Sequence, residues 1–204
     1  DRLEIARKAI AEHGGKTYAA PLDITDPASV EENHAAITAE LGPVDILINA
    51  AGNSGRSTIV DHPDSLWNAM LEVNLTGSYR MTRTCLPGMI ERGWGRVVLC
   101  GSIAGRMGGL MAEPHYAASK GAVHALTRWL SLRYAKDGVS VNAVAPGAVA
   151  TRMTEGTDID PARVPLGRKL TPDEIAWPIT YLLSPAASGM VGAVMDVNGG
   201  VIFS

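Results

Sequence analysis

The stretch Tyr116-Ala117-Ala118-Ser119-Lys120 sets a phenol and an ammonium group four residues apart. On a helix this spacing puts both groups on one face. A lysine beside a phenol stabilises the phenolate and lowers a pKa that is otherwise about 10, so the tyrosine can exchange a proton near neutral pH. Any helix can carry such a pair by chance. The meaning of the stretch therefore depends on the chain around it.

On both sides of this stretch, apolar strand-like runs alternate with helical patterns. The expected strands are residues 16–22, 44–49, 96–100, 140–145 and 193–197, and the expected helices are residues 1–12, 27–41, 64–90, 116–137 and 172–183. This alternation is typical of a parallel sheet with helices on both faces. The sequence therefore predicts one α/β domain with a doubly wound parallel sheet over residues 1–204.

Two helix starts carry capping signals. Asp26 precedes Pro27, which matches an N-cap residue followed by proline at the first helical position. The run Thr171-Pro172-Asp173-Glu174 matches a capping box with the same proline preference. Both signals fix where we expect these helices to begin.

The composition argues against several classes of partner. The 204 residues carry a net charge of -3, so the composition does not indicate a basic surface that would bind nucleic acid or a membrane. Apolar runs end well short of the roughly 18 to 20 residues that a membrane span needs. The two cysteines and five histidines show no disulfide or metal-ligand spacing. We therefore predict no nucleic-acid partner, no membrane partner and no metal site, and a reducing cytoplasmic location.

Several polar landmarks follow the expected strands in a fixed order. They are Asp23-Ile24, Asn49-Ala50-Ala51-Gly52, Asn74, Ser102 within Gly101-Ser102-Ile103-Ala104-Gly105, Tyr116 with Lys120, and Pro146-Gly147 with Thr151. No single landmark is specific, but the ordered set resembles the short-chain dehydrogenase/reductase family over essentially the whole chain. The resemblance implies a Rossmann-type fold, and it is greatest to the 3-oxoacyl-carrier-protein reductase and the sugar or polyol dehydrogenase branches.

The resemblance also implies a chemistry, in which a ketone and a secondary alcohol are interconverted by hydride transfer with NAD or NADP. Tyr116 would act as general acid and base, and Lys120 would lower its pKa and reach the nicotinamide ribose. Ser102 would orient the substrate oxygen. Asn74 would sit in a local helix distortion that holds a water in a proton relay to Lys120.

Further residues are implied as cofactor contacts by the same resemblance. Asp23 and Ile24 would contact the adenine, and Asn49, Ala51 and Gly52 would approach the adenosine side. Ala50 stands where the family usually has a second asparagine. The segment with Pro146, Gly147, Val149 and Thr151 would meet the nicotinamide side, where glycine permits close approach.

The family's Gly-rich turn, Thr-Gly-x-x-x-Gly-x-Gly, is absent from the printed sequence. We therefore expect a domain truncated at its N-terminus, without the first strand, first helix and second strand. Residues 16–22 would then be displaced, poorly ordered or paired directly beside residues 44–49. Two hypotheses remain: an NAD(P)-dependent enzyme of which this is a fragment, or a truncated, non-catalytic chain that acts as a binding or assembly partner.

Two features concern substrate access and assembly. Residues 146–170 have a helix-breaking composition and follow a strand, so we expect a substrate lid there. The family usually pairs through its two long helices, here residues 64–90 and 116–137. We therefore expect a homodimer or homotetramer.

Overall fold

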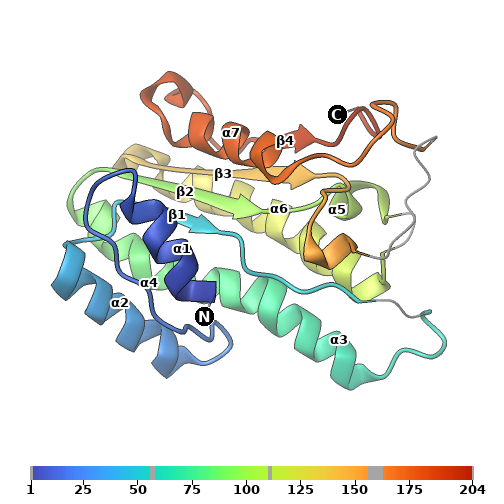
Figure 1. Cartoon of the computed structure of the whole chain (residues 1–204), viewed down its shortest axis with the longest axis horizontal. Helices are drawn as coiled ribbons and strands as arrows, with labels where there is room; N and C mark the ends of the chain where they lie inside the picture. The colour runs from blue at the N-terminus through green and yellow to red at the C-terminus, as the bar shows by residue number, and fades with distance from the viewer. Residues whose placement is uncertain (1, 56–57, 110–111, 156–162, 204) are drawn as a thin grey trace.

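Four parallel strands form the sheet in this computed structural model, in the order β1-β2-β3-β4 (Figure 1). Their bounds are β1 Ile46–Asn49, β2 Gly95–Cys100, β3 Val139–Pro146 and β4 Val194–Val197. The structure describes residues 2–55, 58–109, 112–155 and 163–203. Four of the five predicted strands are confirmed to within two residues at each end, and the parallel α/β arrangement is confirmed with them.

The helices lie on both faces of this sheet (Figure 1). Their bounds are α1 Arg2–Ala11, α2 Pro27–Leu41, α3 Asp64–Leu71, the π-helix η1 Glu72–Gly77, α4 Ser78–Glu91, α5 Ala104–Met107, α6 Pro114–Tyr134, η2 Ala135–Asp137, η3 Arg152–Thr154, α7 Pro172–Leu183 and η5 Pro185–Ala187. Within the described part of the chain, no helix is both long and apolar enough to cross a membrane.

The core divides at β2, because successive strand residues point to opposite faces. Val97 and Leu99 pack with the α4 and α6 side chains, while Val98 belongs to the cluster built on α7. All three side chains are at most 1% exposed. This two-sided burial explains why β2 and β3 are near-continuous apolar runs in the sequence.

Capping chemistry sets the start of two helices. The Asp26 carboxylate accepts a hydrogen bond from the Ala28 N–H at 3.0 Å, and α2 begins at Pro27. Thr171 and Glu174 form the reciprocal capping box at the start of α7. Both predicted helices, residues 27–41 and 172–183, are confirmed with their bounds.

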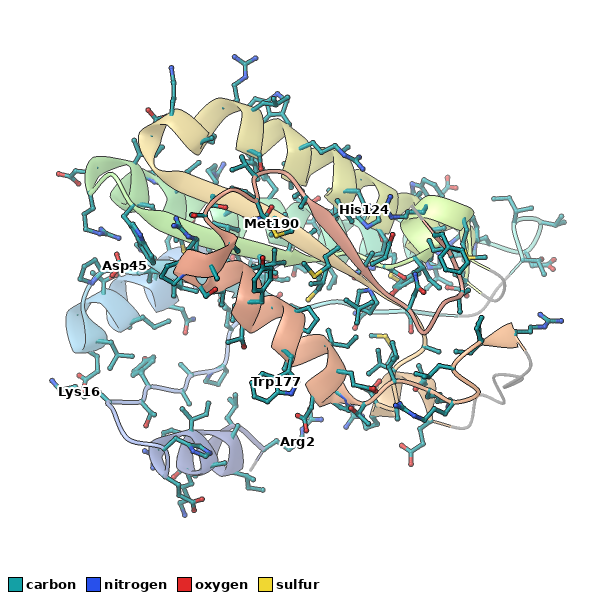
Figure 2. All side chains as sticks on the ribbon, turned by 90° about the horizontal axis from the view of Figure 1, so that it is seen from above. Arg2, Lys16, Asp45, His124, Trp177 and Met190 are labelled. Carbon is teal, nitrogen blue, oxygen red and sulfur yellow. The ribbon has the colours of Figure 1, made fainter. Side chains whose placement is uncertain are left out.

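The predicted strand at residues 16–22 is wrong. This segment has no strand structure, and among the described residues no backbone hydrogen bond joins it to β1. Figure 2 shows Lys16 well apart from Asp45, the residue just before β1. A strand requires a hydrogen-bonded neighbour, so an extended segment at this distance cannot become one. Of the outcomes expected for this segment, displacement from the sheet is the one observed.

The displacement leaves apolar side chains in contact with water near β1. Ile46 and Ile48 on this edge strand are 44% and 47% exposed. Helix α1 has no buried residue, and its Ile5 is 67% exposed. The helix expected at residues 1–12 is confirmed as α1. Because none of its residues is buried, side-chain packing contributes little to its stability.

Candidate active site

Ser102 lies just beyond the carboxyl end of β2. Its Oγ accepts a hydrogen bond from the Ala104 N–H at 3.1 Å, and the residue is 8% exposed. The next N–H along the chain, that of Ile103, donates to the Pro146 carbonyl at 3.1 Å. The second bond joins the Ser102 loop to the end of β3, so the loop expected to orient the substrate oxygen contacts the segment expected to meet the nicotinamide.

A pair of glycines lets the Ser102 loop approach α6. A Cβ on Gly105 would lie only 2.6 Å from the Gly121 N atom and from the Lys120 carbonyl carbon. Any side chain at this position would therefore separate α5 from α6. The close contact brings the loop to the part of α6 that carries Tyr116 and Lys120.

Tyr116 and Lys120 share one face of α6, as their spacing predicts. The Lys120 Nζ lies 5.8 Å from the centroid of the Tyr116 ring. Lys120 is 5% exposed, and its Nζ donates to the Cys100 carbonyl at 2.7 Å. The Ser102 hydroxyl lies close enough to the Tyr116 phenol to lower its pKa, although burial has the larger effect in the opposite direction. The serine, the phenol and the ammonium group are therefore brought together at the end of β2.

The electrostatics of this trio differ from the expectation in one respect. Burial raises the pKa of Tyr116, and the hydrogen bond with Ser102 only partly opposes this rise. Burial also lowers the pKa of Lys120. The expected net depression of the Tyr116 pKa by Lys120 is therefore wrong for this structure, because desolvation of the phenolate outweighs the favourable contacts.

Asn74 lies in the π-helix between α3 and α4, and it is completely buried. Its amide holds the loop after β1: Oδ1 accepts from the Asn53 N–H at 2.8 Å, and Nδ2 donates to the Asn53 carbonyl at 2.9 Å. Nδ2 also donates to the Ser119 Oγ at 3.1 Å. The local distortion expected at Asn74 is present. Its role in a water relay stays a prediction.

The loop after β1 passes directly over this site. A Cβ on Gly52 would lie 3.1 Å from the Asn74 Oδ1 and 3.5 Å from the Lys120 Nζ, so glycine permits this approach. Asn49, which ends β1, is 5% exposed, and its Nδ2 has no hydrogen-bond partner among the described residues. Ala51 between them is exposed. Gly52 thus borders the Lys120 ammonium, and the contacts of Asn49, Ala51 and Gly52 with the adenosine side of a cofactor stay predictions.

The segment after β3 is held by the chain beyond β4. The Gly147 N–H donates to the Val197 carbonyl at 2.9 Å, and a Cβ on Gly147 would lie 2.9 Å from the Asn198 Cα. Val149 forms an isolated parallel bridge with Leu170. Thr151 then caps the short helix η3. Pro146, Gly147, Val149 and Thr151 therefore follow one strand end, and their contacts with a nicotinamide stay predictions.

Asp23 and Ile24 have local structural roles. The Asp23 carboxylate accepts from the Thr25 N–H at 2.9 Å and from its Oγ1 at 2.7 Å, and these bonds hold the pKa of Asp23 below its usual value. Ile24 is 8% exposed and packs on η1, where a Cβ on Gly77 would lie 2.6 Å from its Cδ1. Their adenine contact stays a prediction.

The expected lid is only partly described, because residues 156–162 lie outside the described residues. Its described end is anchored to the chain after β4: the Leu166 N–H donates to the Gly199 carbonyl at 3.0 Å. Val164 and Leu170 are each 5% exposed. The described residues 163–170 are therefore held against the chain after β4, and the lid function stays a prediction.

His124 is a site residue that the sequence reasoning missed. Its Nε2 accepts from the Ser102 N–H at 3.4 Å, and a Cβ on Gly101 would lie 2.3 Å from this atom. Burial, reinforced by nearby arginines, lowers the pKa of His124 to about 4. A neutral imidazole therefore supports the Ser102 loop from α6. His124 lies four residues after Lys120, on the same face of the helix, and this spacing could have identified it as a site residue.

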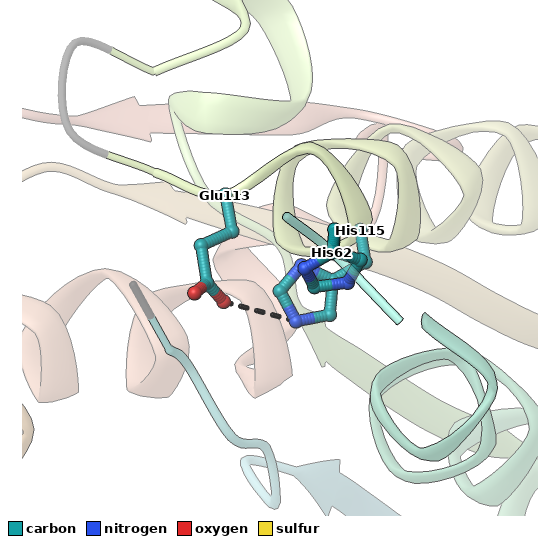
Figure 3. A group of neighbouring side chains, drawn as sticks. All are labelled: His62, Glu113 and His115. Atoms are coloured by element: carbon teal, nitrogen blue, oxygen red, sulfur yellow. Dashed lines mark ion pairs between the residues drawn. The ribbon is translucent and has the colours of Figure 1, made fainter. Parts of the chain in front are cut away.

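A second group was also missed. His62, Glu113 and His115 converge where the loop before α3 meets the start of α6 (Figure 3). The His115 Nε2 lies 2.9 Å from the Glu113 Oε2, and the two imidazole centroids are 4.1 Å apart. Burial lowers the pKa of His115, although the Glu113 charge opposes this shift. Nothing in the spacing of these residues along the chain indicates the cluster.

Comparison with known proteins gives consistent matches. A family model described as enoyl-(acyl carrier protein) reductase matches residues 1–202. The 3-oxoacyl-[acyl-carrier-protein] reductase FabG of Vibrio cholerae is 37% identical over 185 residues, which cover 88% of this chain and 75% of the relative. The inactive 2-(S)-hydroxypropyl-CoM dehydrogenase 2 of Xanthobacter autotrophicus is 37% identical over 207 residues, which cover 96% and 90%.

Solved structures agree with the sequence matches. A candidate NAD(P)-dependent gluconate 5-dehydrogenase from Beutenbergia cavernae, with NADP bound at low occupancy, superposes with a TM-score of 0.90 at 35% identity. The match covers 98% of this chain and 82% of that one. The structure of gox2181 gives a TM-score of 0.92 at 30% identity over 97% and 80% of the two chains.

Proposed function

Because the chain belongs to the short-chain dehydrogenase/reductase family, we propose that it is an NAD(P)-dependent oxidoreductase that interconverts a ketone and a secondary alcohol. One observation carries this proposal. Ser102, Tyr116 and the buried Lys120 converge at the carboxyl end of β2, the edge at which parallel α/β sheets bind their ligands. This arrangement supports proton transfer to or from a substrate oxygen.

Two polar groups at this edge fit a dinucleotide cofactor. The buried Asn49 Nδ2 has no hydrogen-bond partner among the described residues, so it can donate to a ligand. The Lys120 ammonium has three N–H donors, and the bond to the Cys100 carbonyl uses one of them. Lys120 can therefore hold ribose hydroxyls as well. When bound, NAD or NADP supplies or accepts the hydride.

The residues of the chain manage the proton. In ketone reduction the Tyr116 hydroxyl donates its proton to the substrate oxygen as negative charge develops there, and the Ser102 hydroxyl donates a hydrogen bond to the same oxygen. Lys120 then stabilises the phenolate left on Tyr116. In alcohol oxidation Tyr116 takes the proton back. Because burial raises the Tyr116 pKa, the proton donor for reduction is fully formed at neutral pH.

The substitution Tyr116→Phe tests this proposal, because the ring still packs while no proton can be donated. We expect kcat for reduction across a ketone panel to fall by about 100-fold or more, with cofactor binding and the circular dichroism spectrum retained. Tyr79→Phe on α4, where Tyr79 is 44% exposed, is the matched control and should keep wild-type kcat. Wild-type turnover in Tyr116→Phe would refute the assignment.

The competing hypothesis, a non-catalytic binding partner, makes a different prediction. The wild-type protein would then show no turnover with NADH or NADPH and no cofactor binding by calorimetry. The relative from Xanthobacter autotrophicus that is named inactive makes this measurement worthwhile.

The proposal extends to self-association through α3–α4 and α6. Trp129 and Leu132 on α6 are 51% and 87% exposed, and they lie three residues apart on one helix face. Exposed apolar side chains grouped in this way often mark protein contacts. We propose a homodimer or homotetramer that buries them. Light scattering after gel filtration should show a smaller species for Leu132→Glu than for the wild type, and an unchanged mass would contradict this interface.

A further inference from the structure

The cluster of His62, Glu113 and His115 lies beside the proposed catalytic residues without taking part in the proton transfer described above. It joins two separate chain segments, the loop that leads into α3 and the first turn of α6. His115 directly precedes Tyr116 in the sequence. A ligand held by these three side chains would therefore connect both segments at the catalytic end of α6.

The burial of the cluster is unusual for its chemistry. Glu113 is 4% exposed and His115 is 2% exposed. Carboxylates are almost never buried to this extent unless they are paired or bind a metal ion. Glu113 also occupies the N-cap position of α6, yet its side chain makes no capping hydrogen bond. The carboxylate is directed instead to the His115 Nε2, at 2.9 Å.

The surroundings leave room for the carboxylate and for a further ligand contact. A Cβ on Gly55 would lie 2.4 Å from the Glu113 Oε2, so a glycine keeps the loop after β1 from displacing this oxygen. The buried Nδ1 of His115 has no hydrogen-bond partner among the described residues. A histidine ring that lacks such a partner on one side can be reoriented without breaking a bond there.

The ligand geometry is close to that of a metal centre. One ligand atom from each of the three residues lies within 4.8 Å of the other two. Around a tetrahedral zinc ion with bonds of about 2.0 to 2.1 Å, ligand atoms are about 3.3 Å apart. Side-chain shifts of about 1 Å would bring the three ligand atoms to this separation. Two imidazoles and one carboxylate also form a ligand set of the type found in zinc sites that keep a fourth position open.

We propose that His62, Glu113 and His115 form a binding site for a divalent transition metal ion, Zn²⁺ in the first instance. The ion takes the place of the proton between His115 and Glu113 and adds His62 as a third ligand. Its open fourth position is available to water or to a substrate oxygen or nitrogen. This proposal is independent of the proposed oxidoreductase activity, because it concerns residues with no role in the proton transfer.

Calorimetric titration of the chelator-treated protein with ZnCl₂ tests the site directly. We expect one ion per chain with a dissociation constant below about 1 µM, as for protein sites with three ligands. Co²⁺ should give visible d–d absorption bands of tetrahedral intensity. At a zinc concentration 100 times the dissociation constant, the melting temperature should rise by about 5 to 10 °C.

Variants assign the binding to these residues. We expect His62→Asn and Glu113→Gln each to weaken Zn²⁺ binding by about 100-fold or more and to abolish the tetrahedral Co²⁺ spectrum. His13→Asn is the control, because His13 is an exposed histidine just after α1. It should bind both ions like the wild type.

The outcomes that would overturn the proposal are equally definite. A wild-type dissociation constant above about 100 µM would exclude a specific site. Equal affinity of the wild type and both cluster variants would place the metal elsewhere. His62 is only partly buried, so His62→Asn should fold normally and decide the question even if a buried variant does not fold.

Discussion

Replacement of His124 tests how the Ser102 loop is held in place. The His124 Nε2 accepts from the Ser102 N–H at 3.4 Å and lies where a Cβ of residue 101 would be. Burial is the main reason that the pKa of His124 falls to about 4, and the charges of Arg106 and Arg128 add to this effect while Asp196 opposes it. The folded protein therefore keeps this imidazole neutral over most of the acidic range.

The pKa difference sets the size of the effect. A histidine in an unfolded chain has a pKa of about 6.5, so between pH 6.5 and 4 the unfolded state binds a proton that the folded state excludes. The free energy of unfolding therefore falls as the pH drops through this window. At pH 4.5 the loss from His124 is about 2 to 3 kcal/mol, and well below pH 4 it approaches about 3 to 4 kcal/mol.

Urea unfolding at pH 7.5 and at pH 4.5 measures this loss. In His124→Gln the amide can still accept from Ser102 but cannot titrate, so the pH-dependent loss should shrink by about 2 to 3 kcal/mol relative to the wild type. His34→Gln on α2 should lose stability in parallel with the wild type. His124→Leu should cost a further 1 to 3 kcal/mol, roughly, because the Ser102 N–H loses its acceptor. Parallel losses in the wild type and His124→Gln would refute this reasoning.

Three other changes have defined outcomes. Lys120→Met should weaken cofactor binding and shift the pH optimum of alcohol oxidation upward, and an unchanged profile at saturating cofactor would mean that Lys120 does not tune Tyr116. In the unmodified protein, kcat for oxidation should rise with pH while kcat for reduction falls only at alkaline pH, because burial raises the Tyr116 pKa; a common optimum for both directions would contradict this. Leu99→Ala, at a position with no exposed surface, should cost about 2 to 5 kcal/mol in urea unfolding, whereas Val60→Ala, where Val60 is 87% exposed, should change stability by less than about 0.5 kcal/mol.

The sequence predicted the fold best where local chemistry decides it. The bounds of α2 and α7 follow from Asp26 and from the Thr171–Glu174 capping box, which act within one helical turn. Strands β2 and β3 follow from apolar runs that are buried on both faces. Residues 16–22 were expected to form a strand in the same way. Whether a strand forms depends on a hydrogen-bonded neighbour in space, however, and the local sequence does not show whether such a neighbour exists.

In the site, too, contacts within one helix could be predicted from the sequence, and contacts between distant segments could not. The positions of Tyr116, Lys120 and His124 on one face of α6 follow from a spacing of four residues. The cluster of His62 with Glu113 joins residues 51 positions apart, through loops whose path is set by the packing of the whole domain. The sequence contains these residues, but no periodicity connects them.

Burial also explains why the spacing of Tyr116 and Lys120 predicted the wrong direction for the shift of the Tyr116 pKa. The i, i+4 spacing shows that a lysine is near the phenol, but it does not show that both groups are withdrawn from water. Desolvation disfavours the charged form of each, so it raises the pKa of the phenol and lowers that of the ammonium group. Tyr116 is thus protonated at rest, and in the proposed mechanism it acts as a base only when additional positive charge or hydrogen bonding stabilises the phenolate. We therefore expect alcohol oxidation to depend on prior binding of the positively charged oxidised nicotinamide, whereas the proton that ketone reduction needs is already in place on Tyr116.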